Sequence, residues 1–188
     1  MIRFARLPFA LALLPVAVGI AAAQTVTPSA TAAGTSTLSP VDYNFVAQAN
    51  LGAPFQIDSG RIAEQKGTTA AIRDYAHLMA VSHVPVVDAL NTVLQRKGLT
   101  APPDTLLRGA YDAIISSLKA EHGRAFDRDY VDGEVQYQKG NSALFRYEIR
   151  SGTDPDLKEF ARQTLPKIED HLQRALKLAK RTNIAASK

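Results

Sequence analysis

The sequence feature that most constrains the fold is a stretch over residues 72–97 in which apolar side chains recur at alternating spacings of four and three. This alternation puts the recurring residues on one face of a helix, and such a face packs against other helices in a bundle. Its members are Ile72, Ala76, Met79, His83, Val86, Leu90 and Val93. The pattern therefore predicts one continuous helix from Ile72 to Lys97 that carries a single histidine, His83, into the expected core.

Three other long segments show the same alternation, and each carries an amide or imidazole side chain on its apolar stripe. They are residues 40–66 with Gln56, residues 126–150 with Gln138, and residues 155–180 with His171. Four amphipathic helices predict an all-α fold, a four-helix bundle whose core lies on the shared stripes. The Ala- and Leu-rich composition, with only 7% aromatic residues, also favours helices over a β-sandwich.

The ends of the first and last long helices are predicted by capping residues. Ser39 precedes Pro40, and Asp154 precedes Pro155. A side-chain oxygen at the cap accepts a hydrogen bond from an unpaired amide of the first turn, and proline suits the first position because it has no amide hydrogen. We therefore expect helices to begin at Pro40 and Pro155.

A shorter helix is expected between the second and third long ones. The loop over residues 99–104 ends in Asp104, which can cap a helix from Thr105 to Glu121. Gly123 is expected to end this helix.

The N-terminal segment has the pattern of a secretory signal peptide. A short basic start is followed by a Leu- and Ala-rich run, and cleavage is expected between Ala23 and Gln24. The alternative is an uncleaved leader that tethers the protein to a membrane, which two prolines and a length of about 17 residues disfavour. The chain then divides into a signal peptide over residues 1–23, a disordered linker over residues 24–40, the helical domain over residues 41–182 and a frayed tail over residues 183–188. We expect a periplasmic or secreted protein.

Charge and composition exclude several classes of function. The net charge is +4, from 22 basic and 18 acidic residues that are interspersed, so no nucleic-acid surface is indicated. Cysteine is absent, which excludes disulfides, thiolate metal sites and thiol nucleophiles. The sequence has no Gly-rich phosphate loop, dinucleotide fingerprint or paired-histidine zinc motif. We therefore predict no catalytic residues and no cofactor.

The candidate site is the set of polar residues that the four stripes bring inward: Gln56, His83, Gln138 and His171. Buried amides and imidazoles can satisfy one another's hydrogen bonds, through one water if needed, so we interpret the set as a core polar cluster. The alternative is a zinc, iron or copper site at His83 and His171, because facing helices of a bundle can each supply one ligand.

Acidic residues are expected to lie outside this site. The acids nearest to the four positions are Asp58, Glu134, Glu169 and Asp170. All four lie off the predicted stripes, so the sequence does not predict a carboxylate-bridged metal centre, which needs several inward-pointing acids.

Four motifs at this spacing resemble a known bacterial family, domain of unknown function 4142. They are the GRIA segment over residues 60–63, His83, the FDRDY motif over residues 126–130 and the LPKIEDH motif over residues 165–171. The resemblance covers about residues 42–180. It implies a ferritin-like four-helix bundle exported to the periplasm or outer envelope, in which the helix from Thr105 to Glu121 is a connector.

The resemblance also informs the candidate site. Family members commonly carry an acid where Gln56 stands, an aspartate where Ser82 stands and a histidine where Gln138 stands, so only His83 and His171 carry over as site residues. These differences imply a site that has been lost or repurposed. We therefore predict a non-catalytic envelope protein that binds an unknown protein or small-molecule partner, with a metal-binding or redox protein using His83 and His171 as the alternative. A membrane association is expected only if the leader stays uncleaved.

Overall fold

The computed structural model describes residues 38–186, and the side chains of residues 38–182. Within this range every regular element is a helix. The helices are α1 (Pro40–Lys66), α2 (Ala70–Ser82), α3 (Val84–Arg96), α4 (Thr105–Ala120), α5 (Gly123–Ser151) and α6 (Pro155–Ala186). The predicted signal peptide and nearly all of the predicted linker lie outside the described residues.

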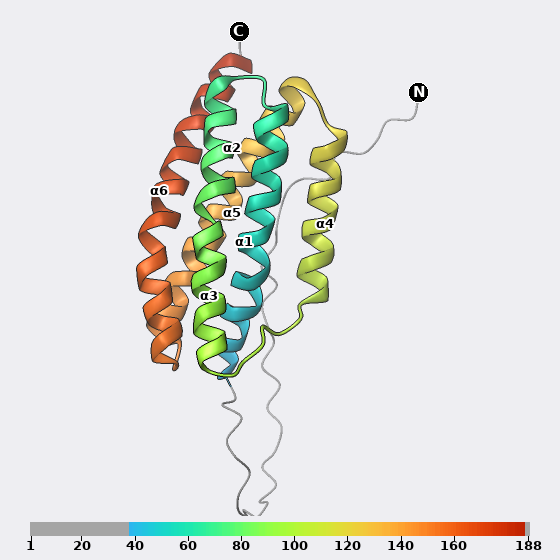
Figure 1. Cartoon of the computed structure of the whole chain (residues 1–188). Coiled ribbons are helices and arrows are strands. Elements are labelled where there is room, and N and C mark those ends of the chain that lie inside the picture. Colours follow the sequence, from blue (N-terminus) through green and yellow to red (C-terminus); the bar gives the residue numbers. More distant parts are fainter. Residues whose placement is uncertain (1–37, 187–188) are drawn as a thin grey trace, which may run out of the picture.

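The helices form a four-helix bundle with one helix at its side (Figure 1). Helices α2 and α3 follow one another along one column of the bundle, and α1, α5 and α6 supply the other three columns. Helix α4 lies beside α1, outside the four columns. The predicted fold class, an all-α bundle with an extra helix between the second and third long columns, is confirmed.

The prediction of one continuous helix over residues 72–97 was wrong at its midpoint. Helix α2 ends at Ser82 and α3 begins at Val84. Pro85 is the physical reason, because it has no amide hydrogen to donate and its ring crowds the carbonyl of Val81. His83, between the two helices, keeps right-handed torsion angles of φ −87° and ψ −16°, so α3 continues in nearly the same direction and the apolar stripe still faces inward.

Capping side chains begin the helices where the sequence predicts. The side chain of Ser39 accepts a hydrogen bond from the amide of Asp42 at 3.2 Å, and that of Asp104 accepts one from the amide of Leu107 at 2.9 Å. Asp154 likewise accepts from the amide of Leu157 at 3.1 Å. These bonds satisfy amides of the first turn that have no partner inside the helix.

Two other helix ends differ from the prediction. Glu121 is the C-terminal cap of α4, and Gly123, which was expected to end that helix, begins α5 with a positive φ of 63°. Glycine adopts the left-handed conformation at little cost, so Gly123 allows a sharp turn into α5. Helix α6 extends past its expected end near Lys180 to Ala186, so part of the expected tail is helical backbone.

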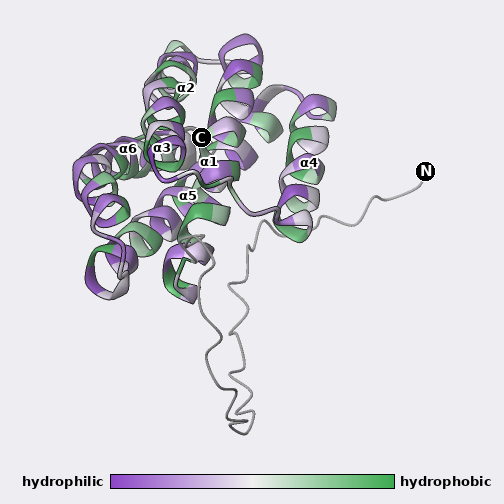
Figure 2. Ribbon diagram, turned by 60° about the horizontal axis from the view of Figure 1, so that its bottom comes forward, coloured by the Kyte–Doolittle hydropathy of each residue, from purple (hydrophilic) through white to green (hydrophobic). Residues whose placement is uncertain are grey.

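The core consists of two large apolar clusters that follow one another along the bundle, and green apolar residues face inward between the helices in Figure 2. One cluster is built around Tyr75, Phe126 and Tyr130, and the other around Phe45 and Phe145. On every column the polar residues of the candidate site lie between the two clusters along the sequence. The site is thus a polar layer in the middle of the bundle.

Helices α1 and α2 approach closely because Gly60 has no side chain. A Cβ atom at this position would lie 2.7 Å from the carbonyl oxygen of Ala76 and 2.9 Å from the amide nitrogen of Ala80. Both atoms belong to the α2 backbone, which has no flexible side chain that could move aside. Gly60 therefore sets the separation of the first two columns at the level of the polar layer.

Candidate functional site

All four predicted site residues are buried in the bundle. Gln56 and Gln138 are 0% exposed, His171 is 2% exposed and His83 is 3% exposed. They do not form one hydrogen-bonded set, however. The two glutamines form one group with further residues, and the two histidines form a second group beside it.

The group that contains the two glutamines links α1 to α5. The Nε2 of Gln138 donates to the Oε1 of Gln56 at 3.2 Å, and the Nε2 of Gln56 donates to the Oε1 of Glu134 at 3.1 Å. The hydroxyl of Tyr75, from α2, donates to the Oε2 of Glu134 at 3.1 Å. Glu134 is therefore the acceptor on which three helices converge.

The expectation that Glu134 lies outside the site was wrong. Its side chain is only 3% exposed, because it precedes Gln138 by four residues and so lies on the same face of α5, one turn away. The spacing of four residues between Glu134 and Gln138 is visible in the sequence. A wider predicted stripe on this helix would therefore have included Glu134. Asp58, Glu169 and Asp170 do lie outside the polar layer, and each forms an ion pair with an arginine at the surface.

Burial changes the protonation of Glu134. Loss of solvent raises its pKa from 4.5 to about 7, although hydrogen bonds from Gln56, Gln138 and Tyr75 lower it in part. Burial also raises the pKa of Tyr75 well above its usual value. Burial therefore favours the neutral carboxylic acid form of Glu134.

The histidine group joins the break between α2 and α3 to α6. The imidazole rings of His83 and His171 have centroids 5.2 Å apart. The Nδ1 of His83 donates to the carbonyl oxygen of Met79 at 2.9 Å, since a carbonyl can only accept. The Nε2 of His171 lies 3.3 Å from the hydroxyl oxygen of Ser82, and its Nδ1 has no hydrogen-bond partner among the described residues.

Both histidines are neutral at physiological pH. Burial lowers the pKa of His83 to about 4. Burial, followed by the nearby His83, lowers the pKa of His171 to about 3. Neutral imidazoles in a buried site can act as hydrogen-bonding groups or metal ligands.

The chemistry open to the polar layer is restricted. Within residues 38–182, no three His, Cys, Asp or Glu side chains come together in a group that could hold a metal ion. The contact between Ser82 and His171 resembles half of a nucleophile–base pair, but no described group orients the Nδ1 of His171, as a third member of a triad would. The geometry thus fits a packed polar layer better than a reactive centre.

The space beside His83 is too small for a ligand. A cavity of about 10 Å³ borders His83, Tyr137, Asn141 and Lys167. A site of this volume holds about one water molecule. This cavity, lined by described residues, therefore has no room for a metabolite.

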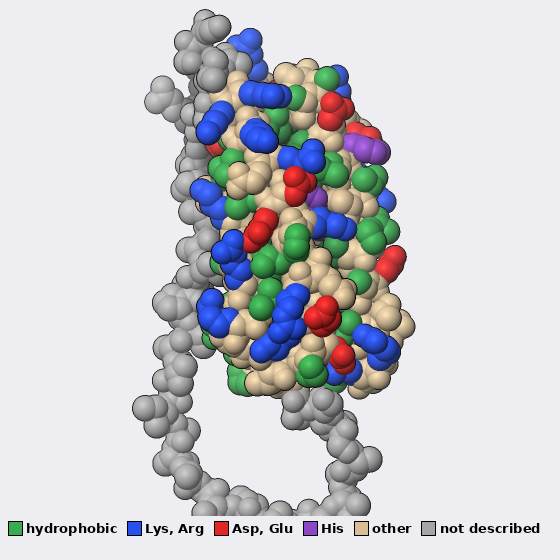
Figure 3. Space-filling model, turned by 90° about the vertical axis from the view of Figure 1, so that its left-hand side faces the viewer, with side chains coloured by type: hydrophobic (Ala, Val, Ile, Leu, Met, Phe, Trp, Pro, Cys, Tyr) green, Lys and Arg blue, Asp and Glu red, His purple; other side chains and the backbone are tan. Residues whose placement is uncertain are grey.

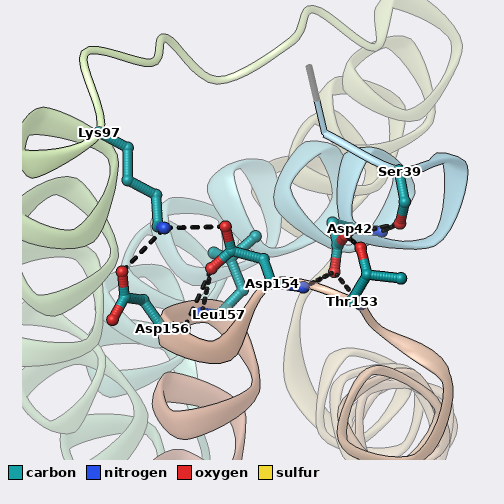
Figure 4. A network of polar contacts seen from close by, with 7 residues as sticks. All are labelled: Ser39, Asp42, Lys97, Thr153, Asp154, Asp156 and Leu157. Carbon is teal, nitrogen blue, oxygen red and sulfur yellow. Dashed lines mark hydrogen bonds and ion pairs between the residues drawn. The ribbon is translucent and has the colours of Figure 1, made fainter. Parts of the chain in front are cut away.

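A second polar network, which sequence reasoning missed, closes the end of the bundle where α1 begins (Figure 4). The carboxylate of Asp42 accepts hydrogen bonds from the amide of Thr153 at 3.0 Å, its hydroxyl at 2.6 Å and the amide of Asp154 at 3.2 Å. Beside it, the Nζ of Lys97 lies 2.8 Å from carboxylates of Asp154 and Asp156. The network ties the start of α1 and the end of α3 to the turn between α5 and α6.

The pKa values of Asp42 and of Glu148, a buried acid beside this network, are shifted in opposite directions. Burial raises the pKa of Asp42, but hydrogen bonds from Ser39, Thr153 and Asp154 outweigh it and hold the pKa well below its usual value. Burial and the adjacent Asp42 raise the pKa of Glu148 to about 8. Asp42 is thus the charged acceptor, and Glu148 is the acid kept neutral beside it.

Comparison with known proteins agrees with the fold. A fragment of a DUF305 protein from Deinococcus radiodurans has a similar crystal structure, with a TM-score of 0.67 and 14% sequence identity, over 77% of this chain and 98% of the fragment. The comparison with curated proteins gave no match. Among the described helices, none has the length and apolar character needed to cross a membrane. A family model described as Domain of unknown function (DUF4142) matches residues 27–178, and the chain therefore belongs to the DUF4142 family.

Proposed function

We propose that this protein is an exported, non-catalytic envelope protein that binds a partner or small ligand on its outer surface and not in its core. The observation that carries the proposal is the closed interior. Three of the helix columns converge on Glu134 through hydrogen bonds, and the cavity beside His83 has room for about one water. A bundle that stores or transforms a ligand would keep an internal space for it.

Export is supported by the residues that precede the bundle. Residues 1–23 combine a basic start, an apolar run and terminal alanines, which is the composition of a cleaved secretory signal. The mature protein would begin at Gln24. A folded bundle without cysteine needs no oxidising compartment, so export would serve the location of its partner and not the chemistry of its folding.

A metal-binding or redox function at His83 and His171 is the alternative. It is favoured by the adjacent rings and by the buried Nδ1 of His171 without a described partner. It is disfavoured because the Nε2 of His171 lies against a hydroxyl and the Nδ1 of His83 donates to a carbonyl. Within residues 38–182 no third His, Cys, Asp or Glu side chain joins the two rings as a ligand.

One preparation tests both functions. The full chain, with its own leader and no histidine tag, is expressed in a bacterium and purified from the periplasm for intact mass and metal analysis. We expect the mass of a chain whose first residue is Gln24. We also expect no stoichiometric metal, even after incubation with zinc, iron or copper.

Matched variants make the metal result decisive. His83→Gln with His171→Gln removes the core histidines, and His77→Gln with His122→Gln removes two exposed ones. Stoichiometric metal that is lost only in the core variant would replace our proposal by the alternative. An unprocessed protein that stays with the membrane fraction would contradict release into the periplasm.

A further inference from the structure

A groove of about 380 Å³ runs between α2 and α6, on the side of the bundle that faces the viewer in Figure 3. Its apolar lining comes from Ala71, Tyr75 and Leu78 on α2 and from Leu178 on α6. The hydroxyl of Tyr75 is bonded to Glu134 in the core, so the part of Tyr75 left to the groove is its ring. The groove thus offers an apolar surface about two helical turns long.

The α6 wall of the groove is basic. It carries Arg174, Lys177 and Arg181, and Figure 3 shows Lys and Arg side chains along this face, interspersed with apolar and acidic ones. Arg174 is paired with Asp170, with its Nε 2.6 Å from a carboxylate oxygen. Lys177 and Arg181 form no ion pair within residues 38–182, and Asp74 is the acid on the opposite wall.

The spacing of these two cations suits one anionic group. Lys177 and Arg181 are four residues apart, so their side chains lie on the same face of α6, one turn from each other. Two such donors can converge on a single phosphate or carboxylate with charge-assisted hydrogen bonds. The apolar lining begins beside them, at Leu178 and Tyr75.

We infer that the groove between α2 and α6 binds a small amphipathic anion, whose phosphate or carboxylate lies between Lys177 and Arg181 and whose apolar chain lies along Ala71, Tyr75, Leu78 and Leu178. The volume falls in the range of small-molecule sites, and the pairing of an apolar surface with two cations disfavours neutral or cationic ligands. Two cations over one turn are too few for a nucleic acid. The inference deepens the proposed function, since it names a ligand class for the outer surface.

The test uses the mature chain and decyl phosphate, kept below its micelle-forming concentration, in isothermal titration calorimetry. Decanol and decyltrimethylammonium serve as neutral and cationic probes with the same chain. We expect saturable binding of one decyl phosphate per protein, and weaker binding of both other probes. Amide chemical shifts in nuclear magnetic resonance spectra should change at Tyr75, Leu78 and Leu178.

Matched variants on α6 separate the groove from general charge. Lys177→Ala with Arg181→Ala should weaken decyl phosphate binding at least about tenfold, because both charge-assisted hydrogen bonds to the phosphate are lost. Arg162→Ala with Lys180→Ala removes the same charge from exposed positions of α6 outside the groove and should leave the affinity unchanged. Both variants alter only exposed side chains, so circular dichroism should show the same helix content.

Three outcomes would overturn the inference. They are equal weakening in both variants, equal binding of the cationic probe, and failure of decyl phosphate to bind while vesicles of phosphatidylglycerol bind the protein. The last outcome would point to a membrane surface as the partner. None of them depends on metal content or leader cleavage, so a failure here is distinguishable from a failure of the proposed function.

Discussion

At the scale of single residues, Glu134 and the two core histidines share one polar layer but differ in how burial affects them. Burial raises the pKa of Glu134 and lowers the pKa values of His83 and His171. In each case the low-dielectric interior favours the neutral form. Stability should therefore depend on pH in opposite directions for the two kinds of group.

Glu134 should destabilise the fold at alkaline pH. Its pKa rises from 4.5 when unfolded to about 7 when folded, so its stabilisation is complete below pH 4.5 and is lost as the pH rises through 7. Glu134→Gln, which stays neutral, should therefore raise the free energy of unfolding at pH 8 by about 3 kcal/mol and change it little at pH 5. Urea denaturation at both pH values measures this difference.

The control for this prediction is Asp132→Asn, which replaces an exposed acid by an amide on the same helix. Its pH dependence should match that of the unaltered protein. An identical pH dependence for Glu134→Gln and the unaltered chain would show that Glu134 is already charged when folded, or equally neutral in both states.

The histidines should destabilise the fold at acidic pH. Their folded pKa values, about 4 for His83 and about 3 for His171, lie below the unfolded value of 6.5, so the unfolded state binds protons first. Each histidine should lower the free energy of unfolding by about 2 kcal/mol between pH 6.5 and 4.5. The variant with His83→Gln and His171→Gln should lose less stability over this interval in urea titrations.

A second pair of variants checks the assignment. His77→Gln with His122→Gln, at exposed positions, should keep the acid sensitivity of the unaltered protein. If the exposed pair abolishes the sensitivity and the core pair does not, the burial argument for His83 and His171 fails.

At the scale of helices, two local backbone features decide how the columns meet. Pro85 interrupts the second column at His83, while the conformation of His83 keeps α2 and α3 nearly aligned. Gly60 lets α1 lie against the α2 backbone at Ala76 and Ala80. Pro85 removes one helical hydrogen bond, and Gly60 permits a close approach of α1 and α2 that a larger residue would prevent.

Gly60→Ala should destabilise the protein. The added methyl group would lie 2.7 Å from the carbonyl oxygen of Ala76, so α1 and α2 would have to separate. Overpacking of this kind costs about 1–3 kcal/mol, and a lower midpoint in thermal unfolding measures it.

Gly140→Ala is the matched substitution for Gly60→Ala. Gly140 lies inside α5, and a Cβ there would meet nothing within 4 Å. Alanine should stabilise the protein by about 0.5–1 kcal/mol at this position, because it has the better helix propensity. Equal effects of the two substitutions would contradict the close approach at Gly60.

At the scale of the whole molecule, the bundle and α4 differ in how they are held. The four columns share two large apolar clusters and the polar layer between them. Helix α4 packs on the bundle through a small cluster, in which the rings of Tyr111 and Phe55 are stacked at 4.3 Å, and through Leu118, which joins one of the large clusters. Leu106 at its start is 85% exposed.

Helix α4 should open without unfolding of the bundle. Of its residues only Tyr111 and Leu118 are buried, so detaching α4 should cost less free energy than global unfolding. In native-state hydrogen exchange, the amides of α4 should exchange faster than those near the middle of α5, and Phe55→Ala should widen the difference. Exchange of α4 amides only at the global rate would mean that α4 is an integral part of the cooperative bundle.

The sequence by itself determined the all-α bundle, the starts of the capped helices and the inward direction of Gln56, His83, Gln138 and His171. These are consequences of local periodicity and capping, which act over a few residues. The break at His83 was also within reach, because Pro85 is visible in the sequence, but the regular stripe outweighed it in the prediction.

Only the tertiary structure decided which polar residues meet. Gln56 and Gln138 are separated by 82 residues, and their hydrogen bond depends on how the columns pack. Glu134 joins them because the buried face of α5 is wider than a single stripe, and the groove is formed where Ala71, Tyr75 and Leu78 of α2 lie opposite Leu178 of α6. Such relations depend on the distance between helices, and helical periodicity carries no information about that distance.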